Sequence, residues 1–177
     1  MGLNNQEISA QKISTVVELL RRLQPGFLPE EIFHAIARLT VLTALEMVPF
    51  SLDTAGRTQV LLLRRSPEDR FWPNRLHVPG TIVRATDHGE NFEGTIERLL
   101  KGEMGDPTVV NRPVIFGVTL RSSIRGTETL IKSWVQISDA PKGELYPFGN
   151  LPKALIQEEI PHIQSAHEHF RNANFPR

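Results

Sequence analysis

The chain has 177 residues, of which 40% are hydrophobic and 23% are charged, a composition typical of an ordinary globular domain. Lysine and arginine together number 20, as do aspartate and glutamate, so the formal net charge at pH 7 is +0. Because no overall field attracts polyanions, the composition predicts no nucleic-acid and no membrane partner, while a small nucleotide-type ligand remains compatible. The absence of cysteine excludes disulfide bonds, thiolate metal sites and a cysteine nucleophile.

The polar N-terminal residues carry no secretory pattern, and no apolar run approaches the roughly 20 residues that span a bilayer. These features predict a cytoplasmic protein.

Two helices are predicted before the first strand. Apolar residues recur at helical spacing from about Ser9 to Leu23, and Pro25-Gly26 ends the pattern. A shorter helix begins at Pro29, followed by two acids that suit the helix dipole. We assign residues 1–38 to an N-terminal helical extension and residues 39–177 to the main domain. The extension is interpreted as a packed appendage, with formation of a homodimer as the alternative.

The main domain is predicted to be a mixed sheet flanked by helices, an α/β sandwich of the α+β mixed kind. The expected elements, in chain order, are a strand at 39–52, a turn at 53–56, a strand at 59–64, a loop at 66–78, a helix at 91–104 with Asn91 as its N-cap, strands at 114–120 and 127–137 around a turn at 125–126, a loop at 141–152, and a helix at 154–172 broken at Pro161.

One stretch carries the chemistry: WPNRLHVPGTIVRATDHGENFEGTIERLLKGEMG, residues 72–105. Its Pro79-Gly80, Glu90, Arg98, Glu103 and Gly105 resemble the Nudix box, a glycine–glutamate–arginine motif introduced by tryptophan and proline-glycine. Seven residues separate Glu90 from Arg98, as in that family. The resemblance covers about residues 39–170 and implies a Nudix-type α/β/α sandwich with a mixed β-sheet.

The box departs from the family pattern in three ways. Three extra residues lie between Gly80 and Glu90, and two helix glutamates are replaced by Leu99 and Gly102. At about 100° per residue, positions 99, 102 and 103 of a regular helix lie on one side. In the family that side holds divalent cations against a pyrophosphate, so here only Glu103 remains, and the double substitution Leu99→Glu with Gly102→Glu is expected to raise metal affinity.

The resemblance implies roles for individual residues. It makes Glu103, Glu90 and the Gly80 carbonyl the ligands of Mg²⁺ or Mn²⁺, with Arg98 orienting the acids; without it, Glu90 is a helix-start acid and Arg98 a surface residue. Beyond the box, Glu144 is the candidate loop carboxylate for catalysis, and Asp87 and His88 could reach the site from the insertion. Four residues are predicted to bind substrate: Arg64, Trp72, Tyr146 and Phe148.

Three functions are compatible with these residues. The first is Mg²⁺-dependent hydrolysis, by pyrophosphatase chemistry, of a nucleoside diphosphate linked to another group. The second is a Nudix module that binds a nucleotide or an ADP-ribose-like ligand without hydrolysing it, which the loss of two glutamates favours. The third is an interaction protein whose N-terminal helices form the working surface. The family resemblance favours the enzyme and the altered box disfavours it.

Overall fold

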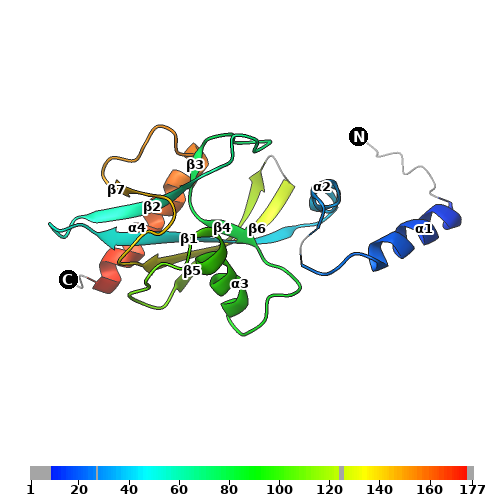
Figure 1. Ribbon diagram of the computed structural model, residues 1–177, viewed down its shortest axis with the longest axis horizontal. Coiled ribbons are helices and arrows are strands. Elements are labelled where there is room, and N and C mark those ends of the chain that lie inside the picture. Colours follow the sequence, from blue (N-terminus) through cyan, green and yellow to red (C-terminus); the bar gives the residue numbers. More distant parts are fainter. Residues whose placement is uncertain (1–8, 27, 124–125, 175–177) are drawn as a thin grey trace.

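The structure is a computed structural model that describes residues 9–26, 28–123 and 126–174. Figure 1 shows a body built around one twisted sheet, with the N-terminal helices at one end. No helix in the described part of the chain is long and apolar enough to cross a membrane.

Both N-terminal helices are present. Helix α1 (Ala10–Arg21) begins at Ser9, whose hydroxyl accepts a hydrogen bond from the Lys12 amide at 3.4 Å, and none of its residues is buried. Helix α2 (Glu30–Leu39) begins directly after Pro29 and lies closer to the sheet in Figure 1. Because α2 continues to Leu39, the first strand starts three residues later than the sequence pattern predicts.

Four long strands form the main part of the sheet. Strand β1 (Leu42–Leu52) pairs antiparallel with β2 (Thr58–Arg64) and parallel with β6 (Gly126–Gln136). Strand β5 (Val114–Ser123) pairs antiparallel with β6 at the edge. Both predicted hairpins are therefore confirmed, and the parallel β1–β6 pair makes the sheet mixed. The predicted turn between β5 and β6 includes residue 125, which lies outside the described residues.

Three short strands complete the seven found in the described residues: β3 (Leu76–His77), β4 (Gly80–Ile82) and β7 (Glu144–Pro147). Strand β4 pairs with β1, and both β3 and β7 pair with β2. The prediction of plain loops at 66–78 and 141–152 is wrong where β3 and β7 lie. Runs of two to four residues are too short to show the alternation by which a strand is recognised in sequence.

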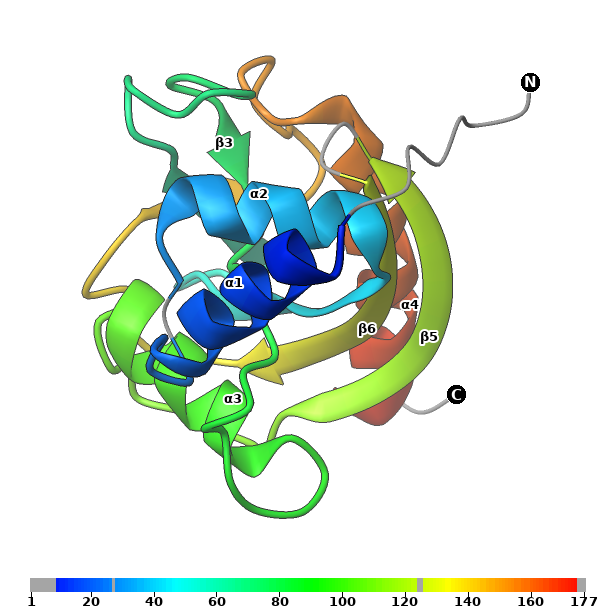
Figure 2. The same ribbon diagram turned by 90° about the vertical axis from the view of Figure 1, so that its right-hand side faces the viewer.

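Helices cover both faces of the sheet, as Figure 2 shows for α4 behind β5 and β6. Helix α4 (Ile160–Asn174) packs Ile163, Ala166 and Phe170 against one face, next to Val48 and Phe50 of β1. Pro161 lies in its first turn, where proline is tolerated, and the preceding short 3₁₀ helix η2 (Gln157–Glu159) takes the place of the predicted break.

The opposite face of the sheet is covered by the box helix. It consists of α3 (Glu93–Arg98) followed directly by a π-helical turn, η1 (Leu99–Glu103). Asn91 and Phe92 both have positive φ, and Phe92 rather than Asn91 is the N-cap. Together the two helical layers and the mixed sheet form an α/β/α sandwich, which confirms the predicted fold class.

Candidate functional site

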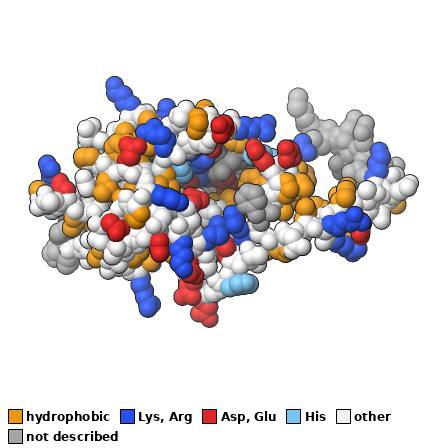
Figure 3. Space-filling view, viewed as in Figure 1, with side chains coloured by type: hydrophobic (Ala, Val, Ile, Leu, Met, Phe, Trp, Pro, Cys, Tyr) orange, Lys and Arg blue, Asp and Glu red, His pale blue; other side chains and the backbone are white. Residues whose placement is uncertain are grey.

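Two neighbouring cavities open where the box helix ends. The main cavity has a volume of about 970 Å³ and lies between α2, β1 and the segment from His77 to Ala85. The side cavity, of about 520 Å³, lies between β2, Glu103 and the loop at 142–144. His77 and Glu103 line both, so the cavities adjoin at these residues. Figure 3 shows a hollow in this face, with acidic and basic side chains around it.

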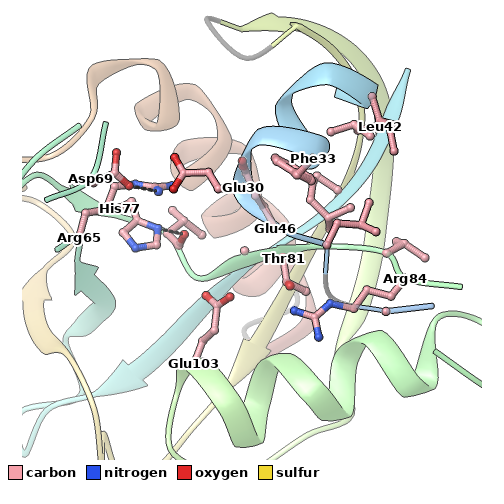
Figure 4. A pocket seen from close by; sticks show the side chains of 18 of the residues that line it. Glu30, Phe33, Leu42, Glu46, Arg65, Asp69, His77, Thr81, Arg84 and Glu103 are labelled. Atoms are coloured by element: carbon pink, nitrogen blue, oxygen red, sulfur yellow. Dashed lines mark hydrogen bonds and ion pairs between the residues drawn. The ribbon is translucent and has the colours of Figure 1, made fainter. Parts of the chain in front are cut away.

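The N-terminal extension forms part of the main cavity. Helix α2 contributes Glu30, Phe33 and Ile36, and the linker from α1 contributes Pro25 and Leu28. Figure 4 shows Phe33 across the cavity from Glu103. The extension is therefore more than the packed appendage that the sequence predicts, because it lines the site.

Glu103 is the last residue of the π-helical turn and points from the helix into the main cavity (Figure 4). Its carboxylate accepts a hydrogen bond from the Gly80 amide. Burial raises the pKa of Glu103, opposed by that hydrogen bond and by the charges of Arg65, Arg98 and Arg84. Glu103, the remaining glutamate of the box helix, therefore has a partly buried carboxyl group with arginines around it.

The resemblance implies that Arg98 orients the box acids. In the structure it instead binds the inserted segment before the helix. Its guanidinium donates to both carboxylate oxygens of Asp87, at 2.9 and 2.7 Å, to the Thr81 hydroxyl at 2.7 Å and to the Ile82 carbonyl at 2.8 Å. Asp87 also accepts from the Arg84 amide and the Thr95 hydroxyl. These hydrogen bonds, those of Arg98 foremost, hold the pKa of Asp87 far below its usual range.

The two altered box positions do not share a side of the helix. Leu99 is 0% exposed and packs with Leu45, Met47 and Met104 in the core, whereas Gly102 is exposed. The π-turn is the cause, since the Met104 amide bonds the carbonyl of Leu99, five residues back, at 3.2 Å. The regular helical wheel is therefore wrong here, and so is the expectation that glutamate at position 99 would face a metal.

Glu90 lies apart from the other predicted ligands. It is exposed in the loop before α3 and lines neither cavity. His88, in the same loop, is exposed as well. The structure thus brings together Gly80 and Glu103 but not Glu90.

The side cavity gathers three of the predicted residues. Arg64 lies 3.3 Å from the Glu144 carboxylate, and both line the cavity with Glu103. The Tyr146 hydroxyl donates to the other oxygen of Glu144 at 2.6 Å. These partners lower the pKa of Glu144, with the Tyr146 hydrogen bond the largest contribution.

None of the three predicted aromatic residues lines either cavity, and two of them pack elsewhere. Phe148 stacks on His167 of α4, with ring centroids 3.7 Å apart. Trp72 packs under the Arg65 guanidinium and beside Phe71. Both rings serve packing in this structure.

The inner wall of the main cavity carries a buried polar network that is not predicted from the sequence. Glu46 of β1 binds Arg121 at 2.7 Å through one oxygen and His162 at 3.1 Å through the other. Arg121 also binds Glu128 at 3.0 Å. Glu159, at the end of η2, lines the same wall. Glu46 offered a visible signal, because a carboxylate within the apolar strand LTALEMVPF requires a partner.

The carboxylates of the main cavity do not fit a divalent-cation cluster. Glu46 is held by Arg121 and His162, and Asp69 by Arg65 and backbone amides. Within the described residues, no three histidine, aspartate or glutamate side chains are arranged to hold a metal ion. By contrast, Nε of Arg65 is a buried donor without a hydrogen-bond partner. Arg65 and Arg84 also line this cavity, so the wall carries guanidinium groups that suit an anionic group.

The sequence matches no protein-family model and no curated protein, whereas the structure is similar to solved Nudix proteins. The NUDIX domain of Shewanella oneidensis NrtR, complexed with ADP ribose, aligns with a TM-score of 0.57 at 17% identity, over 81% of this chain and 99% of that one. The C. elegans Ap4A hydrolase aligns with a TM-score of 0.53 at 15% identity, over 74% of this chain and 98% of that one.

A third similar structure corrects one prediction. It is S. oneidensis NrtR complexed with a 27mer DNA, with a TM-score of 0.56 at 19% identity over 73% of this chain. The alignment covers 62% of that protein, so this chain spans less than two thirds of its length. Since a protein containing this fold is found on DNA, the prediction that nucleic acid is excluded as a partner is wrong.

At identities of 15–19% these similarities concern the fold alone. The chain has the Nudix fold.

Proposed function

We propose that the protein binds a nucleoside-diphosphate ligand of the ADP-ribose type in the main cavity without hydrolysing it. One observation supports this most: a cavity of about 970 Å³ joins an aromatic and apolar roof to arginines, while the box contributes a single carboxylate. Such a volume lies at the upper end of the range for small-molecule sites. The similar NrtR domain, which is complexed with ADP ribose, makes that ligand the natural first probe.

The two sides of the cavity suit the two parts of such a ligand. Phe33, Ile36 and Leu28 offer apolar surface on which a base can stack. Arg65 and Arg84 lie on the cavity wall near Glu103, where guanidinium groups can neutralise a pyrophosphate. Arginine charges would then serve the ligand at the place where the family resemblance implies metal ions.

Calorimetric titration with ADP-ribose at pH 7, with chromatography to detect AMP, tests the proposal. Wild type should bind and release no AMP with or without Mg²⁺. Arg84→Gln should weaken binding about tenfold or more, because a charge-assisted hydrogen bond contributes about 1.5–3 kcal/mol. Arg112→Gln, at an exposed position outside both cavities, is the matched control and should bind as wild type.

Phe33→Ala should also weaken binding by about tenfold, with Leu39→Ala on the exposed side of the same helix as its control. Absence of ADP-ribose binding by the wild type would overturn the proposal.

Hydrolysis dependent on Mg²⁺ or Mn²⁺ is the second candidate, supported by the position of Glu103 between the cavities and of Glu144 in the side cavity. A ligand that occupied both cavities would pass Glu103. Release of AMP that is abolished by Glu103→Gln would favour this enzyme over the binding module.

A further inference from the structure

Glu159 is a buried acid for which the proposed function has so far assigned no role. It is 6% exposed, ends η2 just before α4, and lines the main cavity. Its Oε2 accepts a hydrogen bond from the Val78 amide, the one hydrogen bond of this side chain among the described residues. It forms no ion pair with any residue in the described ranges. A buried carboxyl group without a cation is costly when ionised, so its state needs an explanation.

The surroundings of Glu159 favour its protonated form. Burial and the negative charge of Glu46 raise the pKa of Glu159 to about 8, although the Val78 amide, Arg65 and Arg121 act in the opposite direction. Arg121 of this network is already engaged, since it binds both Glu46 and Glu128, and His162 also binds Glu46. His77, which also lines the wall, is a buried imidazole whose pKa burial lowers to about 4, so it supplies no positive charge at neutral pH.

A protonated carboxyl group differs from an ionised one in a way that matters to a ligand. The neutral form has one O–H donor in addition to its acceptor positions, as a carboxamide has N–H donors, whereas the carboxylate only accepts. With Oε2 bound to the Val78 amide, the remaining hydrogen-bonding capacity of the group is available at the cavity wall.

We propose that Glu159 is a ligand-contacting residue that donates an O–H hydrogen bond to an acceptor atom of the bound nucleotide. The proposal rests on the binding function proposed above and assigns it a recognition residue outside the Nudix box. The acceptor is either on the nucleoside, as a base nitrogen or ribose oxygen, or on the pyrophosphate. Both share one chemistry: an acceptor that the neutral acid attracts and the carboxylate repels.

The test compares wild type with Glu159→Gln by calorimetric titration of ADP-ribose from pH 6 to 9.5. Wild-type affinity should be constant up to about pH 7 and fall close to tenfold per unit above 8, because ionisation removes the donor. Glu159→Gln keeps a neutral donor and acceptor, so its affinity should stay within about threefold of wild type at pH 6 and remain flat. Glu158→Gln, at the exposed neighbouring position, should keep the wild-type pH profile.

A second arm uses adenosine, which lacks the pyrophosphate. The same pH dependence with adenosine places the acceptor on the nucleoside, and a flat adenosine profile beside a sloping ADP-ribose profile places it on the pyrophosphate.

Three results would overturn the proposal. The first is a wild-type ADP-ribose affinity that does not change between pH 7 and 9.5, which needs no variant. The second is an equal slope in wild type and Glu159→Gln, and the third is loss of binding by Glu159→Gln at every pH while its melting temperature is unchanged. Each leaves the binding function standing, whereas absence of wild-type binding at pH 6 overturns both.

Discussion

The two halves of the box helix differ in how far they keep the family pattern. In the first half, Arg98 keeps its family position and makes four hydrogen bonds to Asp87, Thr81 and Ile82. In the second half, the π-turn buries Leu99 and leaves Glu103 as the one box acid in the cavity. The half that organises the fold is retained, while the half associated with metal chemistry has been rebuilt. A Nudix fold can therefore keep its framework without keeping its acidic cluster.

Leu99→Glu tests this comparison most severely. The side chain lies in the core with Leu45, Met47 and Met104, so a glutamate would bury an unpaired charge. We expect a loss of about 4 kcal/mol or more in the free energy of unfolding, measured by denaturant titration. Leu39→Glu, at a position that is 75% exposed, should change stability by less than about 0.5 kcal/mol.

A folded Leu99→Glu variant with wild-type stability and tighter Mn²⁺ binding would reverse the interpretation. Position 99 would then face the site, as the regular helical wheel predicts.

Arg98→Ala should have the next largest effect. It leaves the largely buried Asp87 carboxylate without its cation, which should cost about 3 kcal/mol and lower the melting temperature by roughly 6–12 °C. Lys101→Ala on the same helix removes only the exposed pair with Glu97 and should leave the melting temperature nearly unchanged. Similar melting temperatures for the two variants would show that the Arg98 network does not organise the fold.

The pH dependence of Arg98→Ala sharpens the same point. Because the folded-state pKa of Asp87 is depressed, its ionised form stabilises the fold above its ordinary pKa and this contribution is lost as the solution is acidified. The stability difference between wild type and Arg98→Ala should therefore be largest near neutral pH and shrink in acid, which urea titrations at several pH values would measure. A difference that does not change with pH would place the effect in packing instead.

The sequence predicts the fold well, because long strands and amphipathic helices are recognised by the periodicity of their apolar residues. The parts it misses depend on contacts that no local pattern contains. Strand β7 exists because it pairs with β2, and the π-turn cannot be told from an α-helix by residue spacing.

The same limit applies to the site. The box spacing identifies Gly80 and Glu103, which do lie together. It cannot identify Phe33 or Glu159, which are both more than 50 residues from Glu103 in sequence and join the same cavity only through the fold. The sequence identifies Asp87 as a residue of the insertion that could reach the site. Its pairing with Arg98 depends on how that loop packs against α3.

Gly102→Glu should have the smallest effect on stability. It also tests whether position 102 faces solvent or faces the site beside Glu103. A side chain at position 102 meets nothing within 4 Å, and its backbone has no positive φ, so glutamate fits without strain. Replacing glycine in a helical turn should stabilise the protein by about 0.5 kcal/mol, measured by thermal unfolding. Because residue 102 lines neither cavity, Mn²⁺ affinity followed by calorimetry should remain unchanged. A marked gain in Mn²⁺ affinity from this single substitution would instead mean that the π-turn still presents positions 102 and 103 as a pair, and that one carboxylate is all that separates this cavity from a metal site.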